Sequence, residues 1–239
     1  MTSPKQLARI AGVLYLLVGI FGGFAEGYVE PKMYVAGNAV GTTANVIANS
    51  GLVRMGVMAD LLDGTFFIFL ALALYVLFKD VHKSMARAML VLVMLATAIT
   101  CLAALFEFEG LRIATGAVDF AAFGTAGSSA MVLLMLDAQH YGLLVAQIFF
   151  GLWLAPLGYL AYRSGWFPKA LGVVLIAACV CYLIDLLAAF LAPGLDKAIH
   201  GYVVIVPAIA EPAMVLWLLI VGVKSVKAAK PPVRVAAAA

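Results

Sequence analysis

Residues 52–79 read LVRMGVMADLLDGTFFIFLALALYVLFK, and this stretch decides the fold. It is longer than the roughly 20 apolar residues that let a helix cross a bilayer. Its apolar run is continuous rather than alternating, which favours a helix over a strand. It also carries Asp60 and Asp63, although an acid at the centre of a membrane helix costs roughly 2.5–3.5 kcal/mol. The stretch therefore predicts a membrane-spanning helix with a polar face.

The same apolar pattern recurs along the chain. Of its 239 residues, 66% are hydrophobic and 11% are charged, whereas a soluble domain has about 45–50% and about 25%. We predict an all-α integral membrane bundle, with a single domain over residues 1–229 and a disordered tail over 230–239. The first span is long for a cleaved signal peptide, so we expect it to be retained. The six predicted spans lie near 8–28, 52–79, 84–108, 138–162, 168–193 and 202–224.

Basic residues predict the orientation. If six spans are counted, four of the fifteen Lys and Arg residues fall on one side of the membrane and the other eleven on the opposite side. Because the side rich in Lys and Arg faces the cytoplasm, both termini are predicted inside, in a multi-pass protein of the plasma membrane. The net charge of +3 is thus a topology signal, so we expect the lipid bilayer, and no nucleic acid, as a partner. The four outer basic residues are Lys32, Arg54, Arg112 and Lys197.

Polar residues inside the spans fall at one depth. At 1.5 Å per residue, Asp60, Asp185 and Glu211 each lie roughly 12–13 Å below the outer end of a span. Asp63 lies nearly one turn deeper, and Gln147 lies about 10 Å below the outer end of the fourth span. We therefore predict that these side chains line one cavity that opens to the outside.

Further polar residues lie nearer the outer surface, above a bundle half that is almost purely apolar. Buried acids at close range cannot all be ionised without compensation. Three remedies are open: some acids are protonated, a cation sits among them, or basic side chains fold inward. The alternative is that the acids only hold helices together, through hydrogen bonds worth about 0.6 kcal/mol each. The predicted outer mouth comprises Glu26, Asn45, Arg54, Glu107, Arg112 and His140.

Two outer segments and one helix break are expected. Residues 39–49 predict a short interfacial helix. Residues 109–137 predict an outer loop, whose run 131–136 is re-entrant, lies flat on the membrane or belongs to an ordinary surface loop. Pro207 and Pro212 flank Glu211, and each removes a backbone donor. The sixth span is therefore expected to break beside an acid, either as part of a site or as a simple kink.

Short motifs spread over nearly the whole chain provide a further indication. Together they resemble the bacterial multi-pass membrane family catalogued as domain of unknown function 4386. The resemblance implies a six-span protein of the bacterial inner membrane and points to Asn45, Arg54, Asp60 and Glu211 without giving them a role. It implies no reaction, cofactor or catalytic residue. The motifs are RIAGVLYL (9–16), TANVI (43–47), GLVR (51–54), DL (60–61), LYVL (74–77), FFGL (149–152), GYLAYRSG (158–165), FPKALG (167–172), EP (211–212) and LWLL (216–219).

The sequence leaves three functions open. No phosphate-binding, zinc-protease or Cys-x-x-Cys motif is present, so we predict no cofactor and no metal site, and assign no catalytic residue. The favoured function is binding or transport of a small cation, a proton, or a cationic or amphipathic solute through the acidic cavity. One alternative is a membrane-embedded enzyme that acts on a lipid or lipid-linked substrate from the outer leaflet. The other is a non-catalytic assembly or partner protein, and the oligomeric state is left open.

Overall fold

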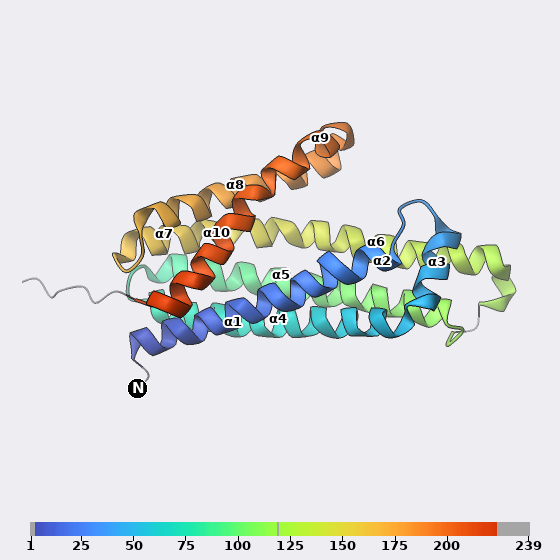
Figure 1. The fold of residues 1–239 in the computed structure, drawn as a ribbon, viewed down its shortest axis with the longest axis horizontal. Helices are drawn as coiled ribbons and strands as arrows, with labels where there is room; N and C mark the ends of the chain where they lie inside the picture. Colours follow the sequence, from blue (N-terminus) through green and yellow to red (C-terminus); the bar gives the residue numbers. More distant parts are fainter. Residues whose placement is uncertain (1–2, 119, 224–239) are drawn as a thin grey trace, which may run out of the picture.

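The computed structural model describes residues 3–118 and 120–223, and the elements within them are helical (Figure 1). Six of the described helical segments are long and apolar enough to cross a membrane. This confirms the predicted all-α fold with six membrane-spanning helices. The tail predicted at 230–239 lies outside the described residues. The six segments are Pro4–Met33, Ser50–Phe78, Lys83–Ala114, Gly124–Ser164, Lys169–Leu191 and Lys197–Val221.

Three of the six spans, the first, fourth and sixth, are built from more than one helical element. Two π-helical turns, η1 and η3, interrupt the first and sixth spans, and η2 is a short 3-10 turn. The elements in chain order are α1 (Pro4–Phe24), η1 (Ala25–Val29), α2 (Glu30–Met33), α3 (Ala39–Ala48), α4 (Ser50–Phe78), α5 (Lys83–Ala114), η2 (Ala121–Phe123), α6 (Gly124–Leu152), α7 (Leu154–Ser164), α8 (Lys169–Leu191), α9 (Pro193–Val203), α10 (Ile205–Leu216) and η3 (Trp217–Val221).

The spans run up and down and close into a ring. Helix α1 packs on α4, α4 on α5, and α5 on α6 and α7; these two pack on α8, α8 packs on α10, and α10 with η3 returns to α1. The short turns at 79–82 and 165–168 place the spans that they join side by side and antiparallel, whereas the first two spans are joined through α3. The start of α1 and the end of η3 lie at one end, called here the terminal end (Figure 1). Helices α2 and α3 lie towards the opposite, distal end.

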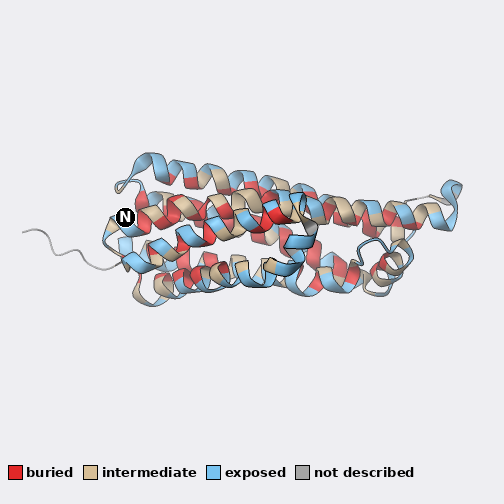
Figure 2. Ribbon diagram, turned by 90° about the horizontal axis from the view of Figure 1, so that it is seen from above, coloured by how far each residue is buried: buried red, intermediate tan, exposed pale blue. Residues whose placement is uncertain are grey.

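The terminal half has a dry aromatic core. Phe67 of α4 meets Trp153 edge to face at 5.0 Å and stacks on Phe150 of α6 at 5.6 Å. Tyr15 of α1 meets the other side of Trp153 at 5.4 Å. Figure 2 shows such buried residues on the faces that the helices turn towards one another. This half of the bundle is therefore filled by side chains, as expected from its apolar sequence.

The segment 109–137 differs from the prediction. Helix α5 continues to Ala114 and α6 begins at Gly124, so the run 131–136 lies inside a long helix and is neither re-entrant nor a surface loop. Small residues let the two helices approach: a Cβ on Gly110 would lie 3.3 Å from Leu136 Cδ2. Leu136 then joins Val29 and Leu111 in a second apolar core at the distal end. Burial between helices therefore outweighs the loop-like composition.

The expected short helix is present, whereas the break in the sixth span lies before Pro207 rather than beside Glu211. Residues Ala39–Ala48 form the short helix α3, which begins where Asn38 Oδ1 accepts a hydrogen bond from the Gly41 amide at 2.8 Å. The sixth span is interrupted at Val204, between α9 and α10, three residues before Pro207. Pro207 thus falls in the first turn of α10, where its missing N–H is tolerated, and Pro212 lies inside α10.

Gly158 of α7 and Gly172 of α8 form the tightest crossing between helices and generate a stability prediction. A Cβ on Gly158 would lie 2.6 Å from the carbonyl oxygen of Gly172. We expect Gly158→Ala to lower the melting temperature in detergent, because overpacking costs about 1–3 kcal/mol, more than the about 0.5–1 kcal/mol gained from helix propensity. Gly19→Ala is the control, since no atom lies within 4 Å of a Cβ there. Equal melting temperatures for the two variants would contradict the close approach of α7 and α8 at Gly158.

Candidate functional site

Glu211 of α10 holds three helices together. Its Oε2 accepts a hydrogen bond from the Tyr15 hydroxyl of α1 at 2.7 Å, and its Oε1 accepts one from the Tyr182 hydroxyl of α8 at 2.9 Å. Both carboxylate oxygens therefore have a donor. Tyr15 also contacts Trp153, so Glu211 is linked through this tyrosine to the aromatic core.

Asp185 lies one turn along α8 from Tyr182 and continues the network. Its Oδ2 accepts a hydrogen bond from Gln147 Nε2 of α6 at 3.0 Å, and its Oδ1 lies 2.8 Å from His200 Nδ1 of α9. The Asp185 side chain is 8% exposed, whereas that of His200 is 58% exposed. The network thus leads from the surface to a buried acid. We call it the α8 network: Tyr15, Gln147, Tyr182, Asp185, His200 and Glu211.

Five more carboxyl groups gather where the first, second and third spans meet. Glu26 interacts electrostatically with Asp60, Asp63 and Glu30, and Glu107 interacts with Asp60 and Glu30. Asp60, Asp63 and Glu107 are buried, at 2%, 6% and 2% exposure. These five residues are called the acidic cluster below.

Two glycines make room for the acidic cluster. A Cβ on Gly22 of α1 would lie 3.4 Å from Asp63 Oδ1, and a Cβ on Gly56 of α4 would lie 3.1 Å from Glu107 Oε1. The missing side chains let the neighbouring helices approach closely enough to enclose both carboxyl groups. The helix packing therefore buries these acids between spans rather than turning them to the bilayer.

The acidic cluster lacks partners that the α8 network has. Asp63 Oδ1 and Glu107 Oε1 are buried without a hydrogen-bond partner. Within residues 3–118 and 120–223, no Lys or Arg forms an ion pair with a member of the cluster, and its ion pair is Glu30 Oε1 with His140 Nδ1, at 2.6 Å. A buried polar atom left unsatisfied costs about 1–3 kcal/mol. The cluster is thus incomplete in a way that a donor or a cation would complete.

Glu26 connects the two groups of polar residues. It lies in the π-turn η1 and interacts electrostatically with Tyr182 of the α8 network as well as with the acidic cluster. Glu26 is exposed despite these neighbours. Gly23 and Gly27 lie four residues apart, on one face of the helix. A Cβ built on either glycine would have no atom within 4 Å, so the space beside them is open. Glu26 thus lies in an irregular helical turn, a type of element that often occurs at functional sites.

A second pair of contacts ties α2 and its following loop to α6 at the distal end. The Tyr34 hydroxyl donates to Asp137 Oδ1 at 2.6 Å, and the Tyr34 ring stacks on His140 at 5.1 Å. Burial and the bond to Asp137 raise the pKa of the Tyr34 phenol. Tyr34 therefore stays neutral and acts as a donor, next to the Glu30–His140 pair.

The structure divides the predicted site residues between these groups. Gln147, Asp185 and Glu211 belong to the α8 network. Asp60 and Asp63 lie in the acidic cluster together with two residues predicted at the mouth, Glu26 and Glu107. His140 pairs with Glu30.

The remaining mouth residues lie apart from the acids. Arg54 is exposed on α4, and Arg112 pairs with Glu109 at 2.7 Å on the surface of α5. Asn45 is half-buried on α3, where its backbone carbonyl accepts a hydrogen bond from the Asn49 side chain at 2.9 Å. Inward folding of basic side chains was one of three remedies left open, and of Arg54, Arg112 and His140 the structure pairs His140 with the cluster.

Sequence reasoning missed several polar partners. Tyr182 could have been found, since it lies three residues before Asp185 and so on the same helix face. Tyr15 gave no such signal, because its role depends on α1 meeting α10. The other missed residues are Glu30, Asp137 and His200.

The described part of the chain offers no preformed set of metal ligands. Among the described residues, no group of three or more His, Cys, Asp or Glu side chains is arranged to hold a metal ion.

Comparison with known proteins confirms the family resemblance. The sequence model of the family described as a domain of unknown function, DUF4386, matches residues 10–222. A protein of Archaeoglobus fulgidus, named "Uncharacterized protein", is 34% identical over 89 residues, which cover 37% of this chain. The matched region spans about half of that relative, 51% of its length. No solved structure matches the chain.

The two tyrosine bonds to Glu211 generate a prediction about the seam between α1, α8 and α10. We expect Tyr15→Phe and Tyr182→Phe each to lower the free energy of unfolding by about 0.6–1.7 kcal/mol, the range measured for hydrogen bonds between membrane helices. Thermal unfolding in detergent measures the loss. Tyr202→Phe serves as the control, because Tyr202 is 76% exposed. If Tyr202→Phe lowers the free energy of unfolding as much as the two variants do, the hydrogen bonds to Glu211 do not hold α1, α8 and α10 together.

Proposed function

The chain belongs to the DUF4386 family, whose description names no activity, and we propose from the site that it binds a small cation, a proton, or a cationic amphipathic solute at its buried acids. The acidic cluster is the binding site in this proposal, and Glu26 is its entrance. The chain is further proposed to lie in the plasma membrane with both termini in the cytoplasm, so that the site opens outwards. The uneven distribution of Lys and Arg supports this orientation.

One observation carries the proposal: buried carboxyl oxygens at Asp63 and Glu107 have no hydrogen-bond partner. Helix contacts alone do not account for it, because a contact that stabilises helices leaves few buried atoms unsatisfied, as the α8 network illustrates. Carboxyl groups at close range repel one another when ionised. Protons or a bound cation remove that repulsion, which makes the cluster selective for positive charge.

The apolar terminal half bears on transport. Phe67, Phe150 and Trp153 fill the bundle below the acids, so a solute bound at the cluster has no polar route onward in this arrangement. Transport would require the ring to open on that side. Helix interruptions at η1, Val204 and η3 lie in the first and sixth spans, which meet at the seam of the ring. Opening of the ring would cost the least free energy at these interruptions.

Binding is tested by thermal shift in detergent with alkali cations, alkaline-earth cations and hydrophobic amines as probes. A ligand at a hundred times its dissociation constant stabilises the folded state by about 2.7 kcal/mol. We expect Asp63→Asn and Glu107→Gln to abolish the shift. We also expect both variants to be more stable than the wild type at neutral pH without added ligand, because each removes one member of a repelling cluster.

Asp80→Asn is the matched control, since Asp80 is an exposed acid in the turn between α4 and α5. It should keep the full ligand response. The proposal fails if every probe leaves the wild type unchanged, or if the control loses the response together with the cluster variants. Uptake into vesicles that contain the purified protein then separates transport from binding.

The orientation is tested by labelling introduced cysteines in intact cells with a membrane-impermeant maleimide. We expect Ala36→Cys, in the exposed loop after α2, to be labelled from outside. Asp80→Cys, at the terminal end, should be labelled only after the cells are broken. The reverse pattern would turn the acidic cluster towards the cytoplasm.

A further inference from the structure

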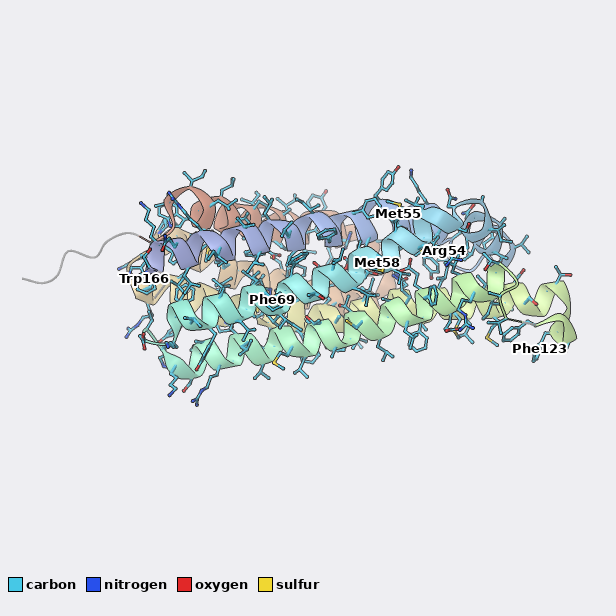
Figure 3. All side chains as sticks on the ribbon, turned by 90° about the horizontal axis from the view of Figure 1, so that it is seen from below. Arg54, Met55, Met58, Phe69, Phe123 and Trp166 are labelled. Atoms are coloured by element: carbon cyan, nitrogen blue, oxygen red, sulfur yellow. The ribbon has the colours of Figure 1, made fainter. Side chains whose placement is uncertain are left out.

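A groove separate from the acids runs along the surface between α1 and α4. It has a volume of about 520 Å³ and is lined by one basic residue and otherwise by apolar side chains. Figure 3 shows Arg54, Met55 and Met58 along the stretch of α4 that lies beside α1. The lining residues are Ile20, Phe21, Phe24, Arg54, Met55, Met58, Ala59 and Leu62.

The groove runs along α4 from near its distal end towards its middle. Arg54 lies in the second turn of α4, near its distal end, and Leu62 lies eight residues deeper. At 1.5 Å per residue this is a path of about 12 Å along the helix. A groove with a charged rim and an apolar floor over this depth matches the polarity profile of a lipid molecule lying beside the protein.

One cation, Arg54, lines the groove, and a second, Lys32, is connected to its wall through Tyr28 and Phe24. Arg54 is exposed, and in the part of the chain that the structure describes it forms no ion pair. Lys32 Nζ lies 3.8 Å above the centre of the Tyr28 ring, which stacks at 5.7 Å on Phe24, a residue of the groove wall. The aromatic ladder therefore brings a second positive charge to the same side of α1. A tyrosine at the headgroup level is typical of a membrane interface.

We infer that this groove binds an anionic phospholipid, with one acyl chain between α1 and α4 and the phosphate paired with Arg54 and Lys32. Guanidinium groups bind phosphate through two parallel hydrogen bonds. The flexible side chains of Met55 and Met58 can adapt to a chain of variable conformation.

A second groove provides the contrast. It lies between α8 and α10, has a volume of about 290 Å³, and is lined by apolar residues without any charged side chain. Without a charged side chain, this groove has no means to select one lipid headgroup over another. The Arg54 groove differs because its basic residue favours an anionic headgroup. This preference distinguishes a specific lipid site from the lipids that surround any membrane protein.

The test adds phosphatidylglycerol or phosphatidylcholine with identical acyl chains to the purified full-length protein in detergent. Thermal shift and native mass spectrometry give the stabilisation and the number of lipids retained. We expect the wild type to prefer phosphatidylglycerol, and Arg54→Gln to bind it about tenfold more weakly because a charge-assisted phosphate contact is lost. Lys32→Gln should weaken it in the same direction. Inorganic phosphate alone should have no effect, since it cannot occupy the groove.

Two controls keep the result specific. Lys197→Gln removes an exposed cation of α9 and should keep the preference, whereas an equal loss there would mean that overall charge decides. Met58→Trp fills the groove and should weaken binding of phosphatidylglycerol. Met94→Trp places the same ring at a similarly exposed site on α5 and should not. Equal binding of the two lipids by the wild type, or an unchanged preference in Arg54→Gln, would overturn the inference.

Discussion

Burial of carboxyl groups without basic partners is the constraint on which the distal half of this bundle depends. Taking an ionised carboxylate out of water costs several kcal/mol unless hydrogen bonds or opposite charges compensate. The chain meets this cost in two ways. Tyr15, Tyr182 and Gln147 donate to Glu211 and Asp185, so the α8 network is satisfied and joins four spans. The acidic cluster is left incomplete, with Asp63 Oδ1 and Glu107 Oε1 unpartnered, and this difference is the basis for proposing it as a binding site.

The incomplete cluster is tolerable because it lies between two apolar cores. Below it, the aromatic contacts of Phe67 and Trp153 fix the terminal halves of α4, α6 and α7. Above it, Val29, Leu111 and Leu136 pack the distal ends together. Rigid packing on both sides holds helices in place that mutual repulsion would otherwise separate. The stability of the cores is therefore a precondition for keeping several acids at close range.

The sequence predicts the spans and the depth of the acids, but not their partners. Asp60 and Asp185 could be placed because helix rise converts residue number into depth. The bond between Tyr15 and Glu211 joins residues 196 positions apart, and no local pattern reveals that the first and sixth spans close the ring. The run 131–136 was misjudged for a related reason. Its small and polar surroundings are typical of a loop, whereas contact with α5 decides its structure.

The position of the helix interruptions connects the acids to the closure of the ring. The π-turns and the break at Val204 occur in the first and sixth spans, where α1 meets α10 and η3. Each of these spans also carries an acid, Glu26 in η1 and Glu211 in α10. Glu26 interacts with Tyr182, whose hydroxyl is bonded to Glu211. In the proposed function, a positive charge held beside Glu26 would act on the donor that links α8 to α10. Since a ligand shifts a conformational equilibrium only through different contacts in the two states, this shared tyrosine would then link occupancy of the cluster to the seam of the bundle.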